Sequence, residues 1–300
     1  MMNFNNIQKI HRTRPEENHL FSLLIPSWNN LEYLKLCIRS IRQNSAFPHQ
    51  IIVLINEGKD GSLSWIKEQP DIDYVYSPDN IGICYGLNVC RPLIHTDYIV
   101  YVNDDMYMLP GWDQNFLDEI QKLRHHWFML SATMIEPQET NNICGLVKNY
   151  GDHPAAFQEE LLLKEFKDLE KPDWSGSTWP PVLIPVKLWD LVGGMSIEFS
   201  PGMYSDPDLS MKLWKAGVRY FKGLGNSKVY HFGSKSTGRI RKNRGRDMFL
   251  RKYGITPNYF VKKFLKRGEP FSGNLTEPKI PWKDKLLHKF KTILLLFQND

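Results

Sequence analysis

Several features that would place a chain in a specialised class are scarce in this sequence. Its 300 residues include four cysteines, and none of them lie at the close spacing typical of a zinc site or a redox motif. We interpret them as reduced core thiols of a cytosolic protein. Residues 1–19 contain no apolar core, which argues against a signal peptide. No apolar run is long enough to span a bilayer.

The common signatures of nucleotide and nucleic-acid binding are also missing. Neither a GxxxxGK[ST] loop nor a GxGxxG pattern follows the first predicted strand, which disfavours ordinary ATPases and dinucleotide-dependent enzymes. No stretch interleaves aromatic and basic residues as a nucleic-acid platform does, so we expect no nucleic-acid partner.

Charge is unevenly distributed along the chain. Residues 239–300 hold 16 of the 38 Lys and Arg residues and 5 of the 33 Asp and Glu residues, a net charge of +11. The preceding 238 residues hold the other 22 basic and 28 acidic residues, a net charge of −6. A basic tail on a mildly acidic body predicts an anionic surface as a partner.

What the sequence does contain is a regular alternation of strand and helix patterns. This alternation predicts an α/β fold with a Rossmann-like, mostly parallel central sheet flanked by helices. In such sheets ligands bind beyond the carboxyl ends of the strands, and polar residues follow each early strand here. The expected early strands are residues 20–26, 50–55, 74–77 and 98–102, and the expected helices between and after them are residues 31–45, 83–93 and 112–123.

The stretch YIVYVNDDMYMLPGW, residues 98–112, carries the clearest chemical signal. A buried-strand pattern runs directly into Asn103, Asp104 and Asp105. Adjacent carboxylates repel each other unless a cation, a hydrogen-bond network or water separates them. A solvated turn at the end of a strand is the ordinary alternative. We interpret the pair as a cation site at the carboxyl end of a central strand.

Five stretches, taken in order, resemble the inverting nucleotide-sugar glycosyltransferases of family 2, which have the GT-A fold. The resemblance spans residues 21–238. The stretches are LLIPSWNN (23–30), IIVLINEGKDGS (51–62), NIGICYGLN (80–88), YIVYVNDDMYMLPGW (98–112) and DLVGGMSIEFSPGMYSDPDLSMKLWKAGVRY (190–220).

The resemblance implies a divalent cation, Mn²⁺ or Mg²⁺, that neutralises a departing diphosphate. Asp105 is the expected metal-binding carboxylate, with Asp104 and Asn103 beside the ribose or the sugar. Asn103 stands where the family has its first acid. His231 is the expected second metal ligand. A His packed between aromatic neighbours, with no ligand role, is the alternative.

The resemblance also implies a general base for the attacking hydroxyl of an acceptor sugar. Asp206 matches the Asp of the family's Glu-Asp pair, and Ser205 replaces the Glu. An Asp that merely begins a helix is the alternative. Asp208 is expected to be structural or to lie near the acceptor as a second possible base.

The donor and the sugar have further expected contacts. Glu57 occupies the position that contacts the nucleobase in the family, and Asn56 replaces an acid before it. Trp174 and Trp179 are expected to face a sugar ring, with core packing as the alternative. The remaining positions expected to line the nucleotide are Pro26, Trp28, Asn29, Asn80, Asn88 and Lys235.

The end of the chain, WKDKLLHKFKTILLLFQND (282–300), has the pattern of a basic amphipathic helix. Its lysines surround an apolar face, which predicts either peripheral attachment to a membrane that carries a lipid-linked acceptor or docking on protein. The apolar face comprises Leu286, Leu287, Phe290, Leu294 and Phe297.

These patterns divide the chain into an N-terminal extension (1–19), a GT-A domain (20–238) and a basic helical extension (239–300). Within the domain, residues 20–135 form the nucleotide-binding half and residues 136–238 the acceptor half. The expected function is the metal-dependent transfer of a sugar, with inversion, from a nucleotide-sugar donor, and a UDP-sugar is favoured. The expected acceptor is a hydroxyl on a glycan or a lipid-linked glycan, in the synthesis of surface polysaccharide or glycan. The expected location is cytoplasmic, at the inner face of the membrane.

Two other functions remain open at this level. A sugar-phosphate nucleotidyltransferase has a similar sheet, although it opens with a Gly-rich basic loop that IPSWNN does not provide. A catalytically degenerate, carbohydrate-binding relative is suggested because Asn56, Asn103 and Ser205 replace acids of the family pattern.

Overall fold

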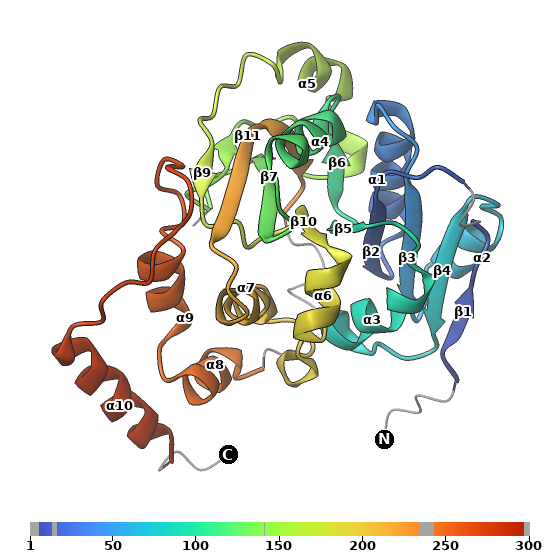
Figure 1. Ribbon diagram of the computed structural model, residues 1–300. Helices are drawn as coiled ribbons and strands as arrows, with labels where there is room; N and C mark the ends of the chain where they lie inside the picture. Colours follow the sequence, from blue (N-terminus) through green and yellow to red (C-terminus); the bar gives the residue numbers. More distant parts are fainter. Residues whose placement is uncertain (1–5, 14–16, 141, 234–242, 297–300) are drawn as a thin grey trace.

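The computed structural model describes residues 6–13, 17–140, 142–233 and 243–296, and one sheet runs through the whole body (Figure 1). The strands are β1 (Gln8–Ile10), β2 (Ser22–Trp28), β3 (Gln50–Asn56), β4 (Ile72–Ser77), β5 (Tyr98–Tyr101), β6 (Met106–Met108), β7 (Phe128–Glu136), β8 (Leu146–Val147), β9 (Trp174–Ser175), β10 (Val182–Pro185) and β11 (Tyr220–His231). The α-helices are α1 (Leu31–Asn44), α2 (Ser62–Lys67), α3 (Gly82–Cys90), α4 (Trp112–Lys122), α5 (Glu159–Glu165), α6 (Val186–Val192), α7 (Ser205–Lys215), α8 (Gly245–Tyr253), α9 (Pro257–Tyr259) and α10 (Trp282–Leu296). Short 3₁₀ turns are η2 (Arg91–Leu93), η3 (Pro154–Ala156) and η4 (Ile197–Phe199), and η6 (Phe260–Phe264) is a π-turn.

The first half of the sheet is parallel, as its sequence predicts. Strands β4, β3, β2 and β5 lie side by side in that order, each parallel to the next. Alternate residues face opposite sides, so that Leu23 and Ile25 pack in the core formed with α1, while Leu24 packs in the core formed with α3. Because helices cover both faces of this part of the sheet, the sequences of these strands are continuous apolar runs. The α/β class and the central sheet with flanking helices are confirmed.

The second half of the sheet brings residues together that are distant in the sequence. Strand β10 is antiparallel to both β5 and β7, and β11 is parallel to β7 and antiparallel to β6. The sequence predicts two strands, at 218–224 and 229–231, whereas β11 is continuous with a register shift between Leu224 and Lys228. The β6–β11 register pairs His231 with Met106. The short strand β6, which the sequence did not predict, therefore sets His231 beside Asp105.

The segment after residue 238 is not a separate extension in its packing. Phe249, Phe260 and Phe264 belong to the same buried core cluster as Trp214 of α7. The rings of Trp214 and Phe264 lie 5.5 Å apart, and those of Trp214 and Phe260 lie 6.3 Å apart. Figure 1 shows α8 and α9 beside α7. The predicted domain boundary at residue 238 therefore does not coincide with a boundary of the core.

No helix within the described parts of the chain combines the length and the apolar character needed to cross a bilayer.

We expect Phe260→Ala to destabilise the whole domain, because Phe260 is fully buried in the shared core. The expected loss is about 3–5 kcal/mol in the free energy of unfolding, measured by denaturant titration. Phe290→Ala is the matched control, since Phe290 is 59% exposed and its loss is expected to cost less than about 0.5 kcal/mol. A main unfolding transition that Phe260→Ala leaves unchanged would show that the C-terminal segment folds independently.

Candidate active site

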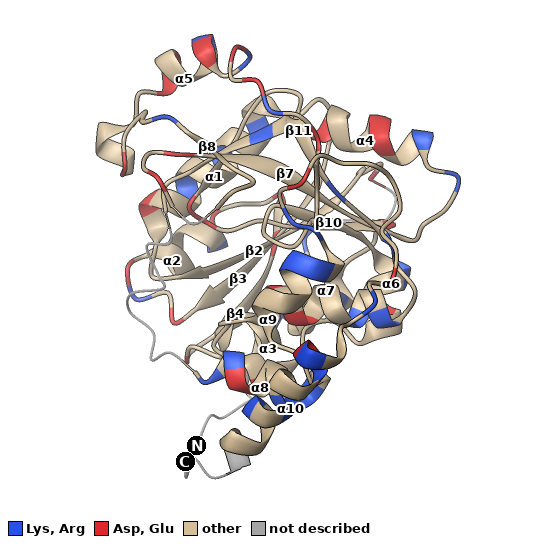
Figure 2. Ribbon diagram, turned by 90° about the vertical axis from the view of Figure 1, so that its left-hand side faces the viewer, with Lys and Arg blue, Asp and Glu red and all other residues tan. Residues whose placement is uncertain are grey.

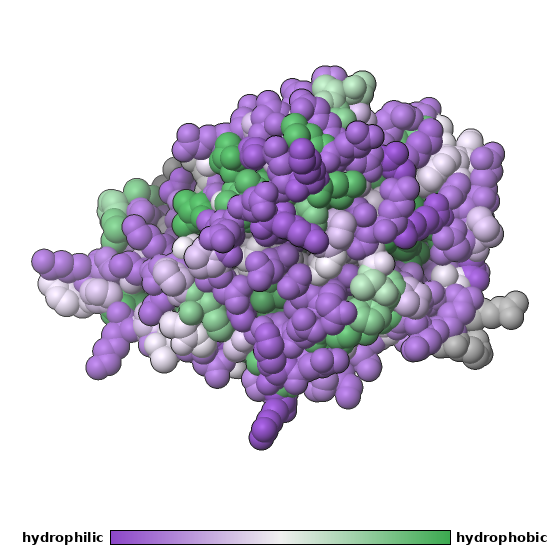
Figure 3. Space-filling view, turned by 90° about the horizontal axis from the view of Figure 1, so that it is seen from above, coloured by the Kyte–Doolittle hydropathy of each residue, from purple (hydrophilic) through white to green (hydrophobic). Residues whose placement is uncertain are grey.

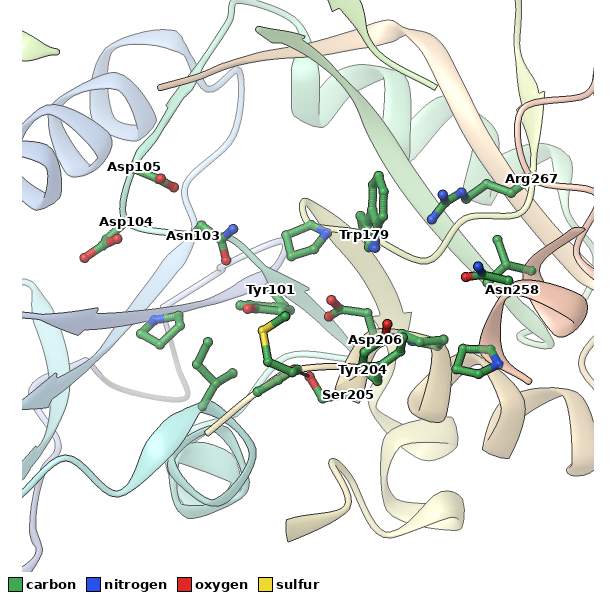
Figure 4. A pocket seen from close by; sticks show the side chains of 18 residues that line it. Tyr101, Asn103, Asp104, Asp105, Trp179, Tyr204, Ser205, Asp206, Asn258 and Arg267 are labelled. Atoms are coloured by element: carbon green, nitrogen blue, oxygen red, sulfur yellow. Dashed lines mark hydrogen bonds between the residues drawn. The ribbon is translucent and has the colours of Figure 1, made fainter. Parts of the chain in front are cut away.

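A cavity of about 630 Å³ opens beyond the carboxyl ends of β2 and β5, and three separate parts of the chain supply its charged and amide side chains. The first part is Asn103, Asp104 and Asp105, which we call the acidic edge, and the second is the start of α7 with Asp206. The third comes from the C-terminal segment, where Asn258 and Arg267 lie. Figure 4 shows Asp206 in the middle of these groups, with the acidic edge on one side and Arg267 on the other.

Behind the acidic edge, a buried histidine lies between two carboxylates. His231 Nε2 is 3.5 Å from Asp105 Oδ1, and His231 Nδ1 is 3.0 Å from Glu136 Oε1. All three side chains are at least nine-tenths buried. Burial acts to lower the pKa of His231, but the negative charges and hydrogen bonds of Asp105 and Glu136 outweigh it and raise the pKa to about 10. The site therefore favours positive charge at this point.

The donor set fits a hard divalent cation that also binds the substrate. Glu136 Oε1 contacts Nδ1 of the His231 imidazole, and this contact leaves Nε2 directed at Asp105. Metal-binding histidines are commonly oriented in this way by a carboxylate on the nitrogen that does not bind the metal. Within the described residues, no group of three or more His, Cys, Asp or Glu side chains is arranged to hold a metal. Asp105 and His231 would therefore supply two ligands, and Mg²⁺-like ions commonly complete such sites with water and substrate phosphates.

Asp206 lies in the first turn of α7, half-buried in the cavity wall. Burial raises the pKa of its carboxyl group to about 7, although the positive charge of Arg267 acts in the opposite direction. A carboxyl group with a pKa near neutrality is suited to accept a proton at physiological pH. Tyr204, the residue directly before α7, has a left-handed backbone (φ 68°) and also lines the cavity.

Arg267 and Asn258 are cavity residues that the sequence analysis missed. The Arg267 guanidinium lies 3.8 Å above the centre of the Trp179 ring, and Trp179 itself lines the cavity. Arg267 Nε is buried without a hydrogen-bond partner among the described residues. Both missed residues come from the segment that the sequence analysis set apart as an extension, and no local motif marks them. The sequence analysis also missed Glu136, although an acidic residue at the end of an apolar strand, here β7, is a signal that could have identified it.

A smaller hollow adjoins the main cavity and shares Pro26, Ile83 and Asp104 with it. Trp28, Asn56 and Asn80 line this hollow as well. Asn56 Oδ1 accepts a hydrogen bond from the Ile81 backbone (3.1 Å), and Asn80 Oδ1 accepts one from Gly82 (2.9 Å), so both amides also shape the loop before α3.

Asn29 and Glu57 form a contact next to this hollow but line neither space. Asn29 Nδ2 donates to Glu57 Oε2 (3.1 Å), and Lys59 Nζ lies 3.2 Å from the same oxygen. Both residues have left-handed backbone conformations, with φ of 48° and 62°. Partial burial would raise the pKa of Glu57, but hydrogen bonds from Lys59, Asn29 and Trp28 lower it, so the carboxylate form is favoured.

Three predicted contact residues lie outside the cavity because other parts of the chain use their polar groups. The Asn88 amide donates to the Met195 carbonyl (2.7 Å) and accepts from the Met195 N–H (2.8 Å). Trp174 is buried, and its Nε1 donates to Thr133 Oγ1 (3.1 Å). We therefore correct the nucleotide contact expected of Asn88. Trp174 follows the alternative of core packing and not the expected contact with a sugar.

Asp208 is the third of these residues. It is fully buried, and its Oδ1 accepts hydrogen bonds from Lys252 Nζ (2.9 Å) and Tyr253 OH (2.6 Å) of α8. Asp208 therefore ties α7 to α8, which is the structural role expected as one alternative, and it does not reach the acceptor space expected as the other. Lys235, expected at the diphosphate, lies outside the described residues.

Comparison with known proteins gives a matching family model and solved structures of similar fold. Residues 22–161 match the family model described as Glycosyl transferase family 2. No curated protein matches the chain in sequence. The crystal structure of S. aureus TarS 1-349 has a TM-score of 0.56 and 12% identity, over 91% of this chain and 70% of that one.

Two further solved structures are similar. TarS 1-349 in complex with UDP-GlcNAc has a TM-score of 0.55 and 13% identity, over 78% of this chain and 65% of that one. GalNAc-T7 with UDP, GalNAc and Mn²⁺ has a TM-score of 0.56 and 14% identity, over 83% of this chain and 51% of that one. This chain covers 44% of the longer TarS structure. At these identities, the similarities concern the fold.

The family match covers the parallel half of the sheet and the acidic edge, and the fold of the solved glycosyltransferase structures extends over most of the chain. The chain therefore carries a glycosyl transferase family 2 domain of the GT-A fold and is a glycosyltransferase.

Proposed function

We propose that this glycosyltransferase moves a sugar from a nucleoside-diphosphate sugar, preferentially a UDP-sugar, to a hydroxyl acceptor with inversion at the anomeric carbon. The main support is a single cavity in which the acidic edge and the Asp206 carboxyl group lie on different walls. The two TarS complexes contain UDP and UDP-GlcNAc, and the GalNAc-T7 structure contains UDP, which favours uridine in the donor.

The proposed donor position follows from the two adjoining spaces. The nucleoside would lie in the smaller hollow against Trp28 and Asn80, with Asp104 at the junction where the ribose meets the diphosphate. Asp105 and His231 would hold a divalent cation that, when bound, neutralises the charge of the departing diphosphate. Glu136 would hold the imidazole in the orientation that presents Nε2.

The proposed chemical step uses Asp206 as the general base. The acceptor hydroxyl oxygen attacks the anomeric carbon from the face opposite the diphosphate, while its proton passes to the Asp206 carboxylate. The bond from the anomeric carbon to the diphosphate oxygen breaks as the new glycosidic bond forms, so the configuration inverts. Arg267 would favour the carboxylate form of Asp206 by its positive charge. Trp179 would offer an aromatic surface beside this space.

The cation site and the preference for one nucleobase can be tested by ligand binding, without measuring turnover. We expect UDP to raise the melting temperature more in the presence of Mn²⁺ than alone, and more than GDP, dTDP or CMP does, because ligands that bind only the folded state stabilise it. Asp105→Ala should lose the Mn²⁺-dependent part of this rise. Asp118→Ala, an exposed carboxylate on α4, is the matched control and should behave as wild type. Equal shifts with every nucleotide, or an unchanged Mn²⁺ response in Asp105→Ala, would contradict these assignments.

The same substitution should affect different properties at two aspartates of α7, the transfer rate at Asp206 and the stability at Asp208. Asp206→Asn should lower the transfer rate by about 10²–10⁴-fold, the usual contribution of a general base, without lowering the melting temperature. Asp208→Asn should lower the free energy of unfolding by about 1–3 kcal/mol, because it weakens a buried link to Lys252 and Tyr253. Initial rates and thermal melting separate the two roles. A fully active Asp206→Asn protein would rule out the proposed base.

The pH dependence of kcat/KM should report the Asp206 carboxyl group. Its pKa of about 7 predicts a rate that rises with pH as the carboxylate forms, and that falls about tenfold for each pH unit below this value. Removing the Arg267 charge in Arg267→Met raises the pKa of Asp206, so the acidic limb should move to higher pH. Arg267→Lys, which keeps the charge, should restore the wild-type limb. Identical acidic limbs in Arg267→Met and wild type would contradict this coupling.

A further inference from the structure

Helix α10 is held against the body by one side only. Tyr259 OH of α9 donates to Asp284 Oδ2 (3.0 Å), and the Tyr259 ring meets the His288 ring edge-on at 4.6 Å. Near the other end of the helix, the Arg251 guanidinium donates to the Leu295 carbonyl (2.8 Å). His288 and Leu295 are buried. These contacts fix which side of α10 faces inward and therefore which side faces out.

The outward side of α10 is apolar. Six of the twelve large hydrophobic side chains that are exposed within the described residues belong to this one helix, and each is between 41% and 67% exposed. Single exposed hydrophobic residues are normal, whereas a contiguous group marks a surface that another phase or molecule covers. By contrast, the face of the molecule seen from above in Figure 3 is mostly hydrophilic, and its hydrophobic side chains form small separate groups. The apolar face of α10 comprises Trp282, Leu286, Leu287, Phe290, Ile293 and Leu294.

The charges of α10 are of one sign wherever they face solvent. The helix carries Lys283, Lys285, Lys289 and Lys291, and its single acid, Asp284, is turned inward to Tyr259. Burial lowers the pKa of His288, so this residue adds no charge near neutral pH. Figure 2 shows the basic residues on α10, at the end of the molecule below α8. An apolar face flanked by lysines is complementary to the surface of a lipid bilayer in which negatively charged headgroups lie above the hydrocarbon chains.

We propose that α10 lies in the headgroup region of an anionic lipid bilayer, with its apolar face buried and its lysines at the lipid phosphates. The charges favour lipid over a second copy of the chain as the occupant. A two-fold pairing of apolar faces would bring two sets of four lysines together, and like charges at an interface oppose association.

The position of α10 connects this surface to the cavity. Pro257 and Asn258 of α9 line the cavity, and the next residue, Tyr259, holds α10. The membrane surface would then lie on the side of the cavity formed by the C-terminal segment. Resting on the proposed function, this placement points to an acceptor hydroxyl on a lipid-linked or membrane-proximal glycan.

Vesicle co-sedimentation of the full chain, without substrate, tests the proposal. The protein should pellet with vesicles that contain phosphatidylcholine and phosphatidylglycerol, more weakly in high salt, and should stay in solution with phosphatidylcholine alone. Leu286→Glu/Phe290→Glu should lower binding to the anionic vesicles by about tenfold or more. Leu191→Glu/Ile197→Glu is the matched control, because it alters two side chains that are 60% and 58% exposed elsewhere. It should bind as wild type does.

Other outcomes overturn the proposal. Absence of wild-type binding to anionic vesicles would exclude the lipid surface, as would equal binding by both double variants. A concentration-dependent dimer that Leu286→Glu/Phe290→Glu abolishes, without vesicle binding, would assign the face to a second copy. Thermal melting of each variant separates loss of binding from loss of folding. Because the assay contains no donor or acceptor, its failure leaves the proposed transfer reaction standing, and failure of that reaction leaves the membrane result standing.

Discussion

A buried imidazole between two carboxylates is the interaction on which the candidate site depends. Asp105 directly precedes β6 and Glu136 ends β7, and their negative charges would repel each other at a buried sheet edge without positive charge between them. Without a cation, a protonated His231 supplies that charge, because, despite its burial, Asp105 and Glu136 raise its pKa to about 10. A bound cation would take the place of the proton on Nε2. The pairing of β6 with β11 makes this arrangement possible, because its register sets His231 next to the strand that follows Asp105.

The site also draws on more of the chain than the family match covers. Residues 22–161 contain the acidic edge and Glu136, but Asp206, His231 and Arg267 lie beyond them. Arg267 reaches the cavity only because the segment after residue 243 packs its phenylalanines into the common core. The C-terminal segment therefore has two connected roles in this account: one end completes the cavity wall, and the other presents the apolar face of α10.

The sequence predicted the parts of the structure that depend on local patterns. Apolar runs followed by polar loops identified the parallel half of the sheet, and the acidic edge and Asp206 could be placed because each sits at the end or start of a recognisable element. Asn88, Trp174 and Asp208 were misplaced because their partners, Met195, Thr133 and Lys252, are 107, 41 and 44 residues away. Arg267 had no local signal, since only tertiary packing brings it to the cavity.

The central claim is that the acidic edge and His231 hold a cation against the donor diphosphate. Diffraction from crystals grown with UDP and Mn²⁺, recorded at the manganese absorption edge, tests it most directly. The account predicts an anomalous peak that contacts both the Asp105 carboxylate and His231 Nε2, beside the diphosphate. Bound UDP with no peak there, and with His231 still directly facing Asp105, would contradict it.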